Sequence, residues 1–301
     1  MTSMAIQEAD GPRSTSTDVA FPSLDGTPLQ GRYWAHTSPR GLLLISHGLG
    51  EHGGSYRRTA ELLVEALEID VLAFDFRGSG RSPGKRGVVR RYEDLCLDID
   101  AANRWAGAER PDLPRFLLGH SNGGLVAIRT VLDRDLGLSG LILSNPSIRV
   151  SAHAPGWKLF IAKLLLRIAP QVTMSTGLSN DQLTHDPEVR AEIEADPLRH
   201  GWISPPLYFG MLATGRMALD RSAEIHLPTL LILGGSDPVI DPKAGRLFFE
   251  GLGAEDKMLK LYAGMRHEPL NEIGREAVLA DLANWLDLHL KSRDDSGSNG
   301  R

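Results

Sequence analysis

The stretch Phe116-Leu117-Leu118-Gly119-His120-Ser121-Asn122-Gly123 decides the fold, because it joins an apolar run to a G-x-S-x-G pattern. A helix-like segment follows at residues 125–132, so Ser121 stands between a predicted strand and a predicted helix. A serine at such a sharp turn has its hydroxyl exposed at the end of the strand. The sequence favours Ser121 as a nucleophile over a glycine-rich turn with an incidental serine.

Short runs rich in valine, leucine, isoleucine and phenylalanine recur between helix-length segments. They lie at residues 41–46, 71–76, 115–119, 138–144, 229–234 and 258–263. This alternation is typical of a parallel sheet with helices on both faces. Two earlier segments, at 18–23 and 29–36, flank an Asp25-Gly26 turn signal and predict an antiparallel start. We expect an α/β fold with a mostly parallel, eight-stranded sheet flanked by helices.

The alternation breaks at residues 148–226, where helix patterns and prolines replace the strands. Ligands bind at the carboxyl ends of strands in open α/β sheets, so we expect this segment to be a helical cap inserted over that edge. The predicted core comprises residues 17–147 and 227–291. Residues 1–16 and 292–301 are predicted to be disordered tails.

Composition is that of an ordinary globular enzyme, with 24% charged residues and a formal net charge of −5. It gives no reason to expect a nucleic acid partner. The first residues lack the apolar core of a secretory signal, and no window reaches the ~18 apolar residues of a membrane span. We therefore expect a cytoplasmic protein, of unknown oligomeric state. Cys96, the one cysteine, is predicted to be a small buried thiol in a helix.

A serine hydroxyl is a poor nucleophile at neutral pH and needs a base and an acid that orients the base. His267 follows a late predicted strand and is the predicted base, whereas His289 in the final amphipathic segment is predicted to lie at the surface. Asp237 comes directly after the strand at 229–234 and is the predicted acid. Asp241 is the competitor, but it precedes a proline and resembles the N-cap of a helix.

An oxyanion needs two preorganised donors. In this architecture one is the backbone N–H after the nucleophile, which belongs to Asn122, and the Asn122 side chain is expected to be incidental. The second is expected from the loop His47-Gly48-Leu49-Gly50-Glu51-His52, and we assign it to the backbone N–H of Leu49.

The same loop carries two other patterns. His47 and His52 invite a metal site, but they lack the H-E-x-x-H spacing and clustered cysteine or carboxylate ligands, so we predict no metal. Residues 48–53 match G-x-G-x-x-G and, taken alone, suggest an NAD(P)-dependent oxidoreductase. That interpretation leaves Ser121 and its predicted partners unexplained, and the strand before the loop is predicted to be interior. We predict no cofactor.

One helical face of the predicted cap is strongly apolar. It carries Trp157, Phe160, Ile161, Leu164, Leu165 and Ile168. A lid helix packed on the core is the simplest explanation of this face. A roof over an acyl chain and a peripheral membrane contact are alternatives that can coexist with it.

Taken together, these residues resemble the α/β-hydrolase superfamily, and within it the monoglyceride lipase and lysophospholipase group. The similarity spans residues 21–290. Its markers are the loop at 47–52, Tyr56, the loop at 75–80, the elbow at 119–124, the cap sequence at 196–198, the segment at 235–237 and His267-Glu268. Together these markers are far more specific than any one of them.

The resemblance implies a serine esterase that cleaves the ester of a glycerol carrying one acyl chain, with the cap forming an apolar tunnel. It places the nucleophile, acid and base on Ser121, Asp237 and His267. The cap side chains expected to cover the acyl chain are Trp157, Phe160, Leu164, Leu165, Leu207 and Met211.

Three positions depart from the best-known monoglyceride lipases. Those proteins have methionine where Asn122 stands, arginine where Ser55 stands and a second histidine where Leu270 stands. A backbone oxyanion donor survives the first change, but polar contacts near the glycerol pocket are expected to differ.

Other functions remain open from the sequence. A lysophospholipase, a broad carboxylesterase or a proline-type aminopeptidase would share the same fold, although a peptidase needs an anchor for a free amino terminus. Glu51, Glu192 and Glu194 are the candidates for that anchor. A noncatalytic binding protein would be expected to lack a triad residue, and none is missing here.

Overall fold

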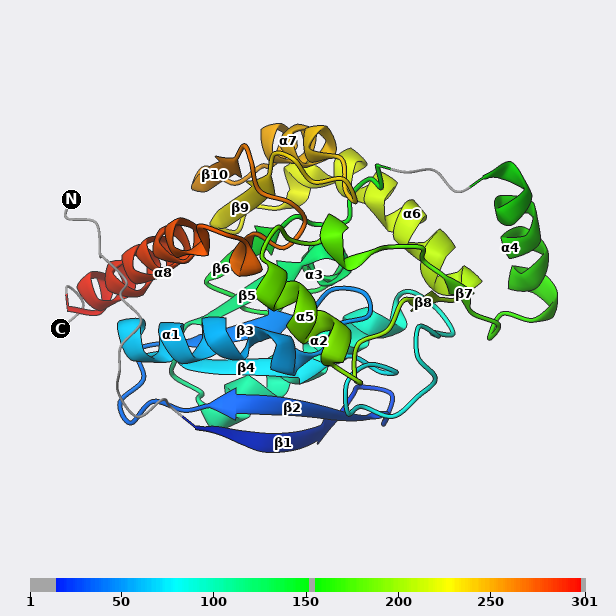
Figure 1. Cartoon of the computed structure of the whole chain (residues 1–301). Coiled ribbons are helices and arrows are strands. Elements are labelled where there is room, and N and C mark those ends of the chain that lie inside the picture. Colours follow the sequence, from blue (N-terminus) through cyan, green and yellow to red (C-terminus); the bar gives the residue numbers. More distant parts are fainter. Residues whose placement is uncertain (1–14, 152–154, 299–301) are drawn as a thin grey trace.

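Eight strands form one sheet in the computed structural model, which describes residues 15–151 and 155–298 (Figure 1). They are β1 (Ser16–Pro22), β2 (Pro28–Trp34), β3 (Leu42–Ser46), β4 (Asp70–Asp75), β5 (Arg115–His120), β6 (Gly140–Ser144), β9 (Thr229–Gly234) and β10 (Lys257–Tyr262). Their order is β1-β2-β4-β3-β5-β6-β9-β10. β2 runs antiparallel to β1 and β4, and the other neighbours are parallel. The predicted mostly parallel, eight-stranded sheet is confirmed.

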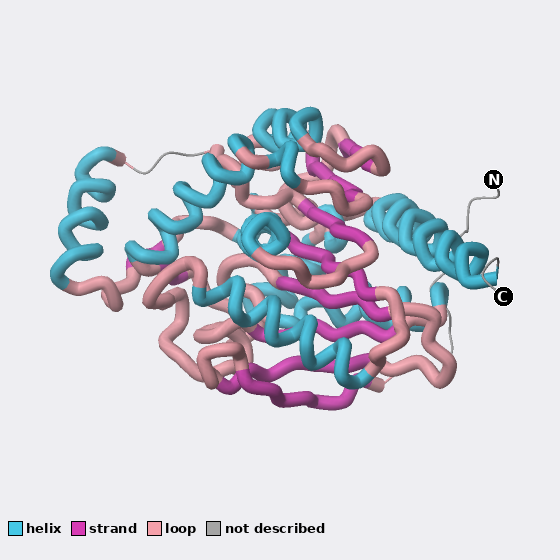
Figure 2. The backbone as a smooth tube through the Cα atoms, turned by 180° about the vertical axis from the view of Figure 1, so that it is seen from behind, coloured by secondary structure: helices cyan, strands magenta, loops and turns pink. Residues whose placement is uncertain are grey.

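Helices cover both faces of this sheet (Figure 2). One layer consists of α1 (Arg57–Leu67) and α8 (Arg275–Ser298), and the other contains α2 (Asp94–Glu109), α3 (Ser121–Asp133) and α7 (Pro242–Gly251). Short 3-10 turns, η1 (Gly53–Tyr56) and η4 (Pro269–Asn271), adjoin α1 and α8.

The sequence of β3 explains this two-sided burial. Leu42 and Leu44 contact the layer of α2, α3 and α7, while Leu43 and Ile45 contact the layer of α1 and α8. Side chains alternate between the faces of a strand, so a strand covered on both faces has a continuous apolar sequence. The predicted antiparallel start is also confirmed, and Gly26 makes its turn with a φ of +84°.

The segment between β6 and β9 is mainly helical. It contains α4 (Gly156–Ile168), β7 (Met174–Ser175), η2 (Asn180–Gln182), α5 (Pro187–Ala195), β8 (Trp202–Ile203), α6 (Pro205–Asp220) and η3 (Ser222–Glu224). The sequence predicts no strand here, and the β7–β8 pair corrects that expectation, because two-residue strands are too short to show an alternating pattern. In Figure 1, α4 projects from the body, whereas α6 packs against α3 and α7. The division into core and cap stays a prediction.

The predicted tails largely fall outside the described residues, which exclude 1–14 and 299–301. β1 begins at Ser16 and α8 continues to Ser298, so the tail predicted from residue 292 begins inside a helix. In the described part of the chain, we find no helix with the length and apolar character needed to span a bilayer.

Candidate active site

The turn from β5 into α3 places Ser121 at the carboxyl edge of the sheet. The φ angle of Ser121 is +51°, a left-handed conformation that is uncommon for a residue with a side chain. Such strain is stored at functional sites when the surrounding structure enforces it. Gly123 is required because an added Cβ would lie 2.2 Å from the carbonyl oxygen of Ser46. The G-x-S-x-G spacing therefore allows α3 to approach β3 closely.

Three side chains from distant loops meet beside this turn. His267 Nε2 lies 2.8 Å from Ser121 Oγ, and His267 Nδ1 lies 2.7 Å from Asp237 Oδ2. All three residues are buried. The other carboxylate oxygen, Asp237 Oδ1, accepts the backbone N–H groups of Val239 at 2.7 Å and Ile240 at 3.0 Å. The fixed carboxylate can hold a proton on Nδ1 and leave Nε2 free to accept one from the serine.

The environment of His267 sets its protonation. Burial alone would lower the pKa of the imidazole, but the charge of Asp237 and the hydrogen bond to it outweigh burial and raise the pKa of His267. Only the neutral imidazole can accept a proton. A raised pKa makes His267 a stronger base, but the neutral form is protonated at a higher pH as the solution is acidified.

The two competing residues have other partners. Asp241 is the N-cap of α7 and accepts the backbone N–H of Lys243. The predicted surface location of His289 is wrong, because its side chain is 8% exposed. Its ring packs on Trp285, with the centroids 3.9 Å apart, and Nε2 lies 2.9 Å from Asp256. The contacts with Trp285 and Asp256 bury His289, and an amphipathic pattern does not show which of its polar positions are covered.

The predicted oxyanion donors flank Ser121. Asn122 is the second residue of α3, where backbone N–H groups have no acceptor within the helix. The N–H of Leu49 makes no hydrogen bond to another described residue. A Cβ added at Gly48 would lie 3.1 Å from Ser121 Cβ, so the loop that carries Leu49 packs directly on Ser121. Leu49 and Asn122 line one cavity. Their backbone N–H groups stay the predicted oxyanion donors.

A buried ion-pair cluster of Glu51, Arg199 and Glu268 connects the loop at 47–52, which we name the oxyanion loop for its predicted role, to the residue after His267. Arg199 Nη2 lies 2.8 Å from Glu51 and 3.1 Å from Glu268. Burial alone would raise the pKa of Glu51, but neighbouring cationic groups and hydrogen bonds hold that pKa below its usual range. Glu51 also accepts the backbone N–H of Gly48 at 2.8 Å and the hydroxyl of Tyr56 at 2.7 Å.

Arg199 thus supports the site from the segment that follows α5. Sequence reasoning missed Arg199, because 148 positions separate it from Glu51 and no local pattern connects them. The neighbouring backbone also docks on the oxyanion loop, since the N–H of His200 donates to the carbonyl of Gly50 at 3.0 Å.

His47 and His52 have structural partners. His47 Nε2 accepts the backbone N–H of Phe76 at 3.1 Å, and His52 Nε2 lies 2.7 Å from Asp196. Over residues 15–151 and 155–298, no cluster of three or more histidine, cysteine, aspartate or glutamate side chains could hold a metal ion.

Within the G-x-G-x-x-G pattern at 48–53, the carboxylate of Glu51 binds the backbone of the same loop. The backbone N–H of Gly48 is one of the groups that would face a phosphate, and it donates to Glu51 instead. Glu51 is 6% exposed, and a carboxylate at this place repels a pyrophosphate. The geometry therefore disfavours a dinucleotide.

The residues predicted to cover an acyl chain fall into two groups. Leu207 and Met211 of α6 are buried, and Leu207 lines the cavity beside Leu49. Trp157, Phe160, Leu164 and Leu165 lie on α4, in which only Ala162 is buried. The expected packing of this apolar face on the core is therefore wrong. Phe160 is 71% exposed and Trp157 is 62% exposed.

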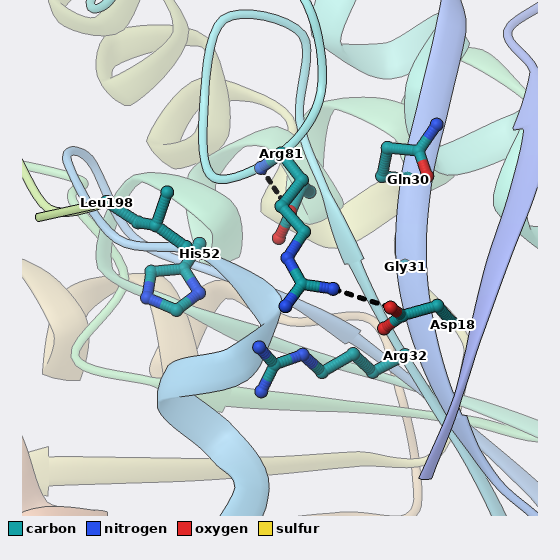
Figure 3. A pocket seen from close by; sticks show the side chains of 8 residues that line it. Asp18, Gln30, Gly31, Arg32, His52, Arg81 and Leu198 are labelled. Carbon is teal, nitrogen blue, oxygen red and sulfur yellow. Dashed lines mark hydrogen bonds and ion pairs between the residues drawn. The ribbon is translucent and has the colours of Figure 1, made fainter. Parts of the chain in front are cut away.

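A second cavity lies on the β1–β2 side of the oxyanion loop (Figure 3). Arg81 reaches Asp18 across it with an ion pair of 2.6 Å. His52 and Leu198 form another part of its wall (Figure 3). Leu198, from the segment after α5, therefore lies in the same cavity wall as His52 of the loop at 47–52.

The sequence pattern of a family described as "Serine aminopeptidase, S33" matches residues 37–274. The chain belongs to this α/β-hydrolase family. A monoacylglycerol lipase of Mycolicibacterium smegmatis is 32% identical to this hydrolase over 279 residues, covering 92% of this chain and 99% of the relative. Phospholipase YtpA of Bacillus subtilis is 30% identical over 260 residues, covering 85% and 99%.

The crystal structure of Paleococcus ferrophilus monoacylglycerol lipase matches the hydrolase with a TM-score of 0.79. The two chains are 33% identical, and the match covers 87% of this chain and 99% of the other. The resemblance to monoglyceride lipase-like α/β-hydrolases is confirmed.

Proposed function

We propose that this hydrolase cleaves monoacylglycerols and similar single-chain lipid esters through an acyl-enzyme intermediate. The observation that carries the proposal is the continuous hydrogen-bond chain from Ser121 through His267 to Asp237. The similarity to monoacylglycerol lipases over nearly the whole chain supports the substrate class.

In the proposed reaction, Ser121 Oγ attacks the ester carbonyl while His267 Nε2 accepts the hydroxyl proton. Asp237 holds the imidazole in the required tautomer and stabilises its positive charge. The backbone N–H groups of Leu49 and Asn122 bind the tetrahedral oxyanion. His267 then gives its proton to the alcohol oxygen as the ester bond breaks, which leaves an acyl group on Ser121. Water, activated by His267, releases the acid and restores the serine.

We propose that the segment at 148–226 covers the acyl chain and contacts the lipid surface. Leu207 supplies buried apolar surface in the cavity that Leu49 and Asn122 line, and Met211 is buried one turn further along α6. The exposed apolar side chains of α4 stand beside Lys158 and Lys163, a combination that suits the interface of an anionic bilayer. Removal of the exposed rings by Trp157→Ser and Phe160→Ser is expected to weaken sedimentation with vesicles without slowing hydrolysis of a soluble ester.

An aminopeptidase is the second candidate, because the matching family carries that description. Such an enzyme needs a carboxylate free to bind an amino terminus. Glu51 is buried and paired with Arg199, and Glu192 pairs with Arg58 at 3.2 Å. Two of the three candidate anchors are thus engaged, which favours the esterase.

Rates for four substrates test the proposal. We expect kcat/KM to be highest for 1-monododecanoylglycerol and p-nitrophenyl dodecanoate, lower for lysophosphatidylcholine, and negligible for proline p-nitroanilide. Faster hydrolysis of lysophosphatidylcholine than of the glyceride would favour a lysophospholipase. Cleavage of the anilide faster than the esters would overturn the proposal.

A further inference from the structure

The side chain of Asn122, expected to be incidental, is held in one orientation. The hydroxyl of Tyr92 donates to Asn122 Oδ1 at 2.8 Å, and both residues are buried. Burial raises the pKa of Tyr92 well above its usual value, so the hydroxyl keeps its proton at neutral pH. No other described residue accepts that proton, so Oδ1 faces Tyr92 and the amide nitrogen Nδ2 faces away from it.

Tyr92 is itself fixed by α6. A Cβ added at Gly210 would lie 2.3 Å from Tyr92 Cβ, so the backbone of α6 packs directly on this residue. The backbone of α6 thus holds Tyr92 in place, and Tyr92 in turn fixes the orientation of the Asn122 amide.

Asn122 Nδ2 is an unpaired donor beside the reaction site. It has no hydrogen-bond partner among the described residues, yet it is not one of their enclosed unpaired polar atoms. Asn122 lines the cavity next to the oxyanion position, together with Leu49, Phe76 and Leu207. The amide nitrogen therefore keeps some accessible surface, and the walls of the cavity that Asn122 lines combine apolar side chains with His47, Arg77, Ser79 and His200.

We propose that Asn122 Nδ2 is a specificity-determining donor that binds an acceptor oxygen, the oxygen of a hydroxyl group near the scissile ester. The inference rests on the proposed esterase function. When a substrate fills the cavity and excludes water, an unpaired amide donor is penalised, whereas a hydroxyl oxygen satisfies it. Binding sites with a polar group of this kind reject analogues that lack the matching oxygen. The hydroxyl can belong to the alcohol or to the acyl chain.

Three dodecanoyl esters distinguish the two sources. They are 1-monododecanoylglycerol, with hydroxyls on the alcohol; ethyl 3-hydroxydodecanoate, with one on the acyl chain; and ethyl dodecanoate, with neither. The measured quantity is kcat/KM of each hydroxylated ester divided by kcat/KM of ethyl dodecanoate. This ratio cancels any effect of a substitution on the oxyanion donors or on folding.

We expect Asn122→Leu, which removes the donor, to lower one ratio by about 10-fold, the usual order for one hydrogen bond lost to a buried group. Asn122→Asp keeps the acceptor for Tyr92 but removes the donor, so it should lower the same ratio. Tyr92→Phe should lower it less, because the amide remains but is no longer oriented. Leu207→Val changes the same cavity without touching a donor and should leave both ratios unchanged.

A fall in the glyceride ratio assigns the subsite to the alcohol, and a fall in the 3-hydroxy ratio assigns it to the acyl chain. Unchanged ratios in Asn122→Leu and Asn122→Asp would overturn the inference, even if all three rates fall together. A wild-type enzyme that hydrolyses ethyl dodecanoate but fails this test would keep its proposed function. Failure to hydrolyse any of the three esters would overturn both.

Discussion

Replacement of Arg199 by methionine tests whether the buried ion-pair cluster supports the site. Arg199 is 10% exposed, and its partners Glu51 and Glu268 are 8% and 2% exposed at their side chains. Removal of one member of a buried pair leaves an uncompensated charge and costs about 3–5 kcal/mol. We expect Arg199→Met to lower the free energy of unfolding by that amount, measured by urea denaturation at pH 7.

The matched control is Arg58→Met. Arg58 pairs with Glu192 at 3.2 Å, but the side chains are 39% and 62% exposed. Exposed pairs contribute about 0–1 kcal/mol. A loss in Arg199→Met within 1 kcal/mol of the loss in Arg58→Met would refute the reasoning about the cluster.

The pH dependence of the stability lost in Arg199→Met gives a second check. The pKa of Glu51 is held low in the folded state, so its paired form stabilises the protein above the unfolded pKa, and this stability is lost as pH falls. The destabilisation by Arg199→Met should therefore shrink on acidification. Adding Glu51→Gln should also recover part of the loss at pH 7. Arg199→Met alone should have a lower kcat, because Arg199 holds Glu51, and Glu51 fixes the loop of the predicted oxyanion donor.

Three further predictions concern the base, the thiol and the oxyanion loop. Asp237→Asn removes the charge that raises the pKa of His267, so the acid limb of the residual pH–rate profile should move to lower pH; an unmoved limb would contradict the assignment. Burial raises the pKa of Cys96 to about 11, so iodoacetamide should label the native protein far more slowly than the urea-unfolded one, and equal rates would contradict this. Gly50 and Gly26 both have positive φ, but a Cβ at Gly50 would lie 2.0 Å from a backbone carbonyl, whereas none lies within 4 Å at Gly26. Gly50→Ala should therefore reduce stability and kcat much more than Gly26→Ala, and equal effects would show that the loop can adjust.

The sequence predicted those features that depend on local pattern and chain order. The strand runs, the Asp25-Gly26 turn and the elbow at Ser121 each carry their signal within a few residues. Chain order also predicted which aspartate and histidine the structure brings to Ser121, since strand ends in a parallel sheet meet at one edge. Their roles as acid and base stay a proposal.

The features that depend on tertiary contacts could not be predicted. Arg199 contacts Glu51 only because the segment after α5 folds back over the oxyanion loop. The burial of His289 follows from the packing of α8, and the exposure of Phe160 follows from the projection of α4. An amphipathic pattern shows that a face is apolar but not what covers it. The orientation of the Asn122 amide likewise depends on a tyrosine 30 positions away.

Covalent labelling of the nucleophile by a fluorophosphonate, which forms a phosphonate ester on serine as fluoride leaves, tests the central claim most directly. A fluorophosphonate reacts with a serine only where a base and an oxyanion site activate it. Intact-mass and peptide analysis should show one adduct per chain on Ser121, no adduct in Ser121→Ala, and greatly slowed labelling in His267→Ala. Labelling of a different residue, or ester hydrolysis by Ser121→Ala at the wild-type rate, would contradict the account.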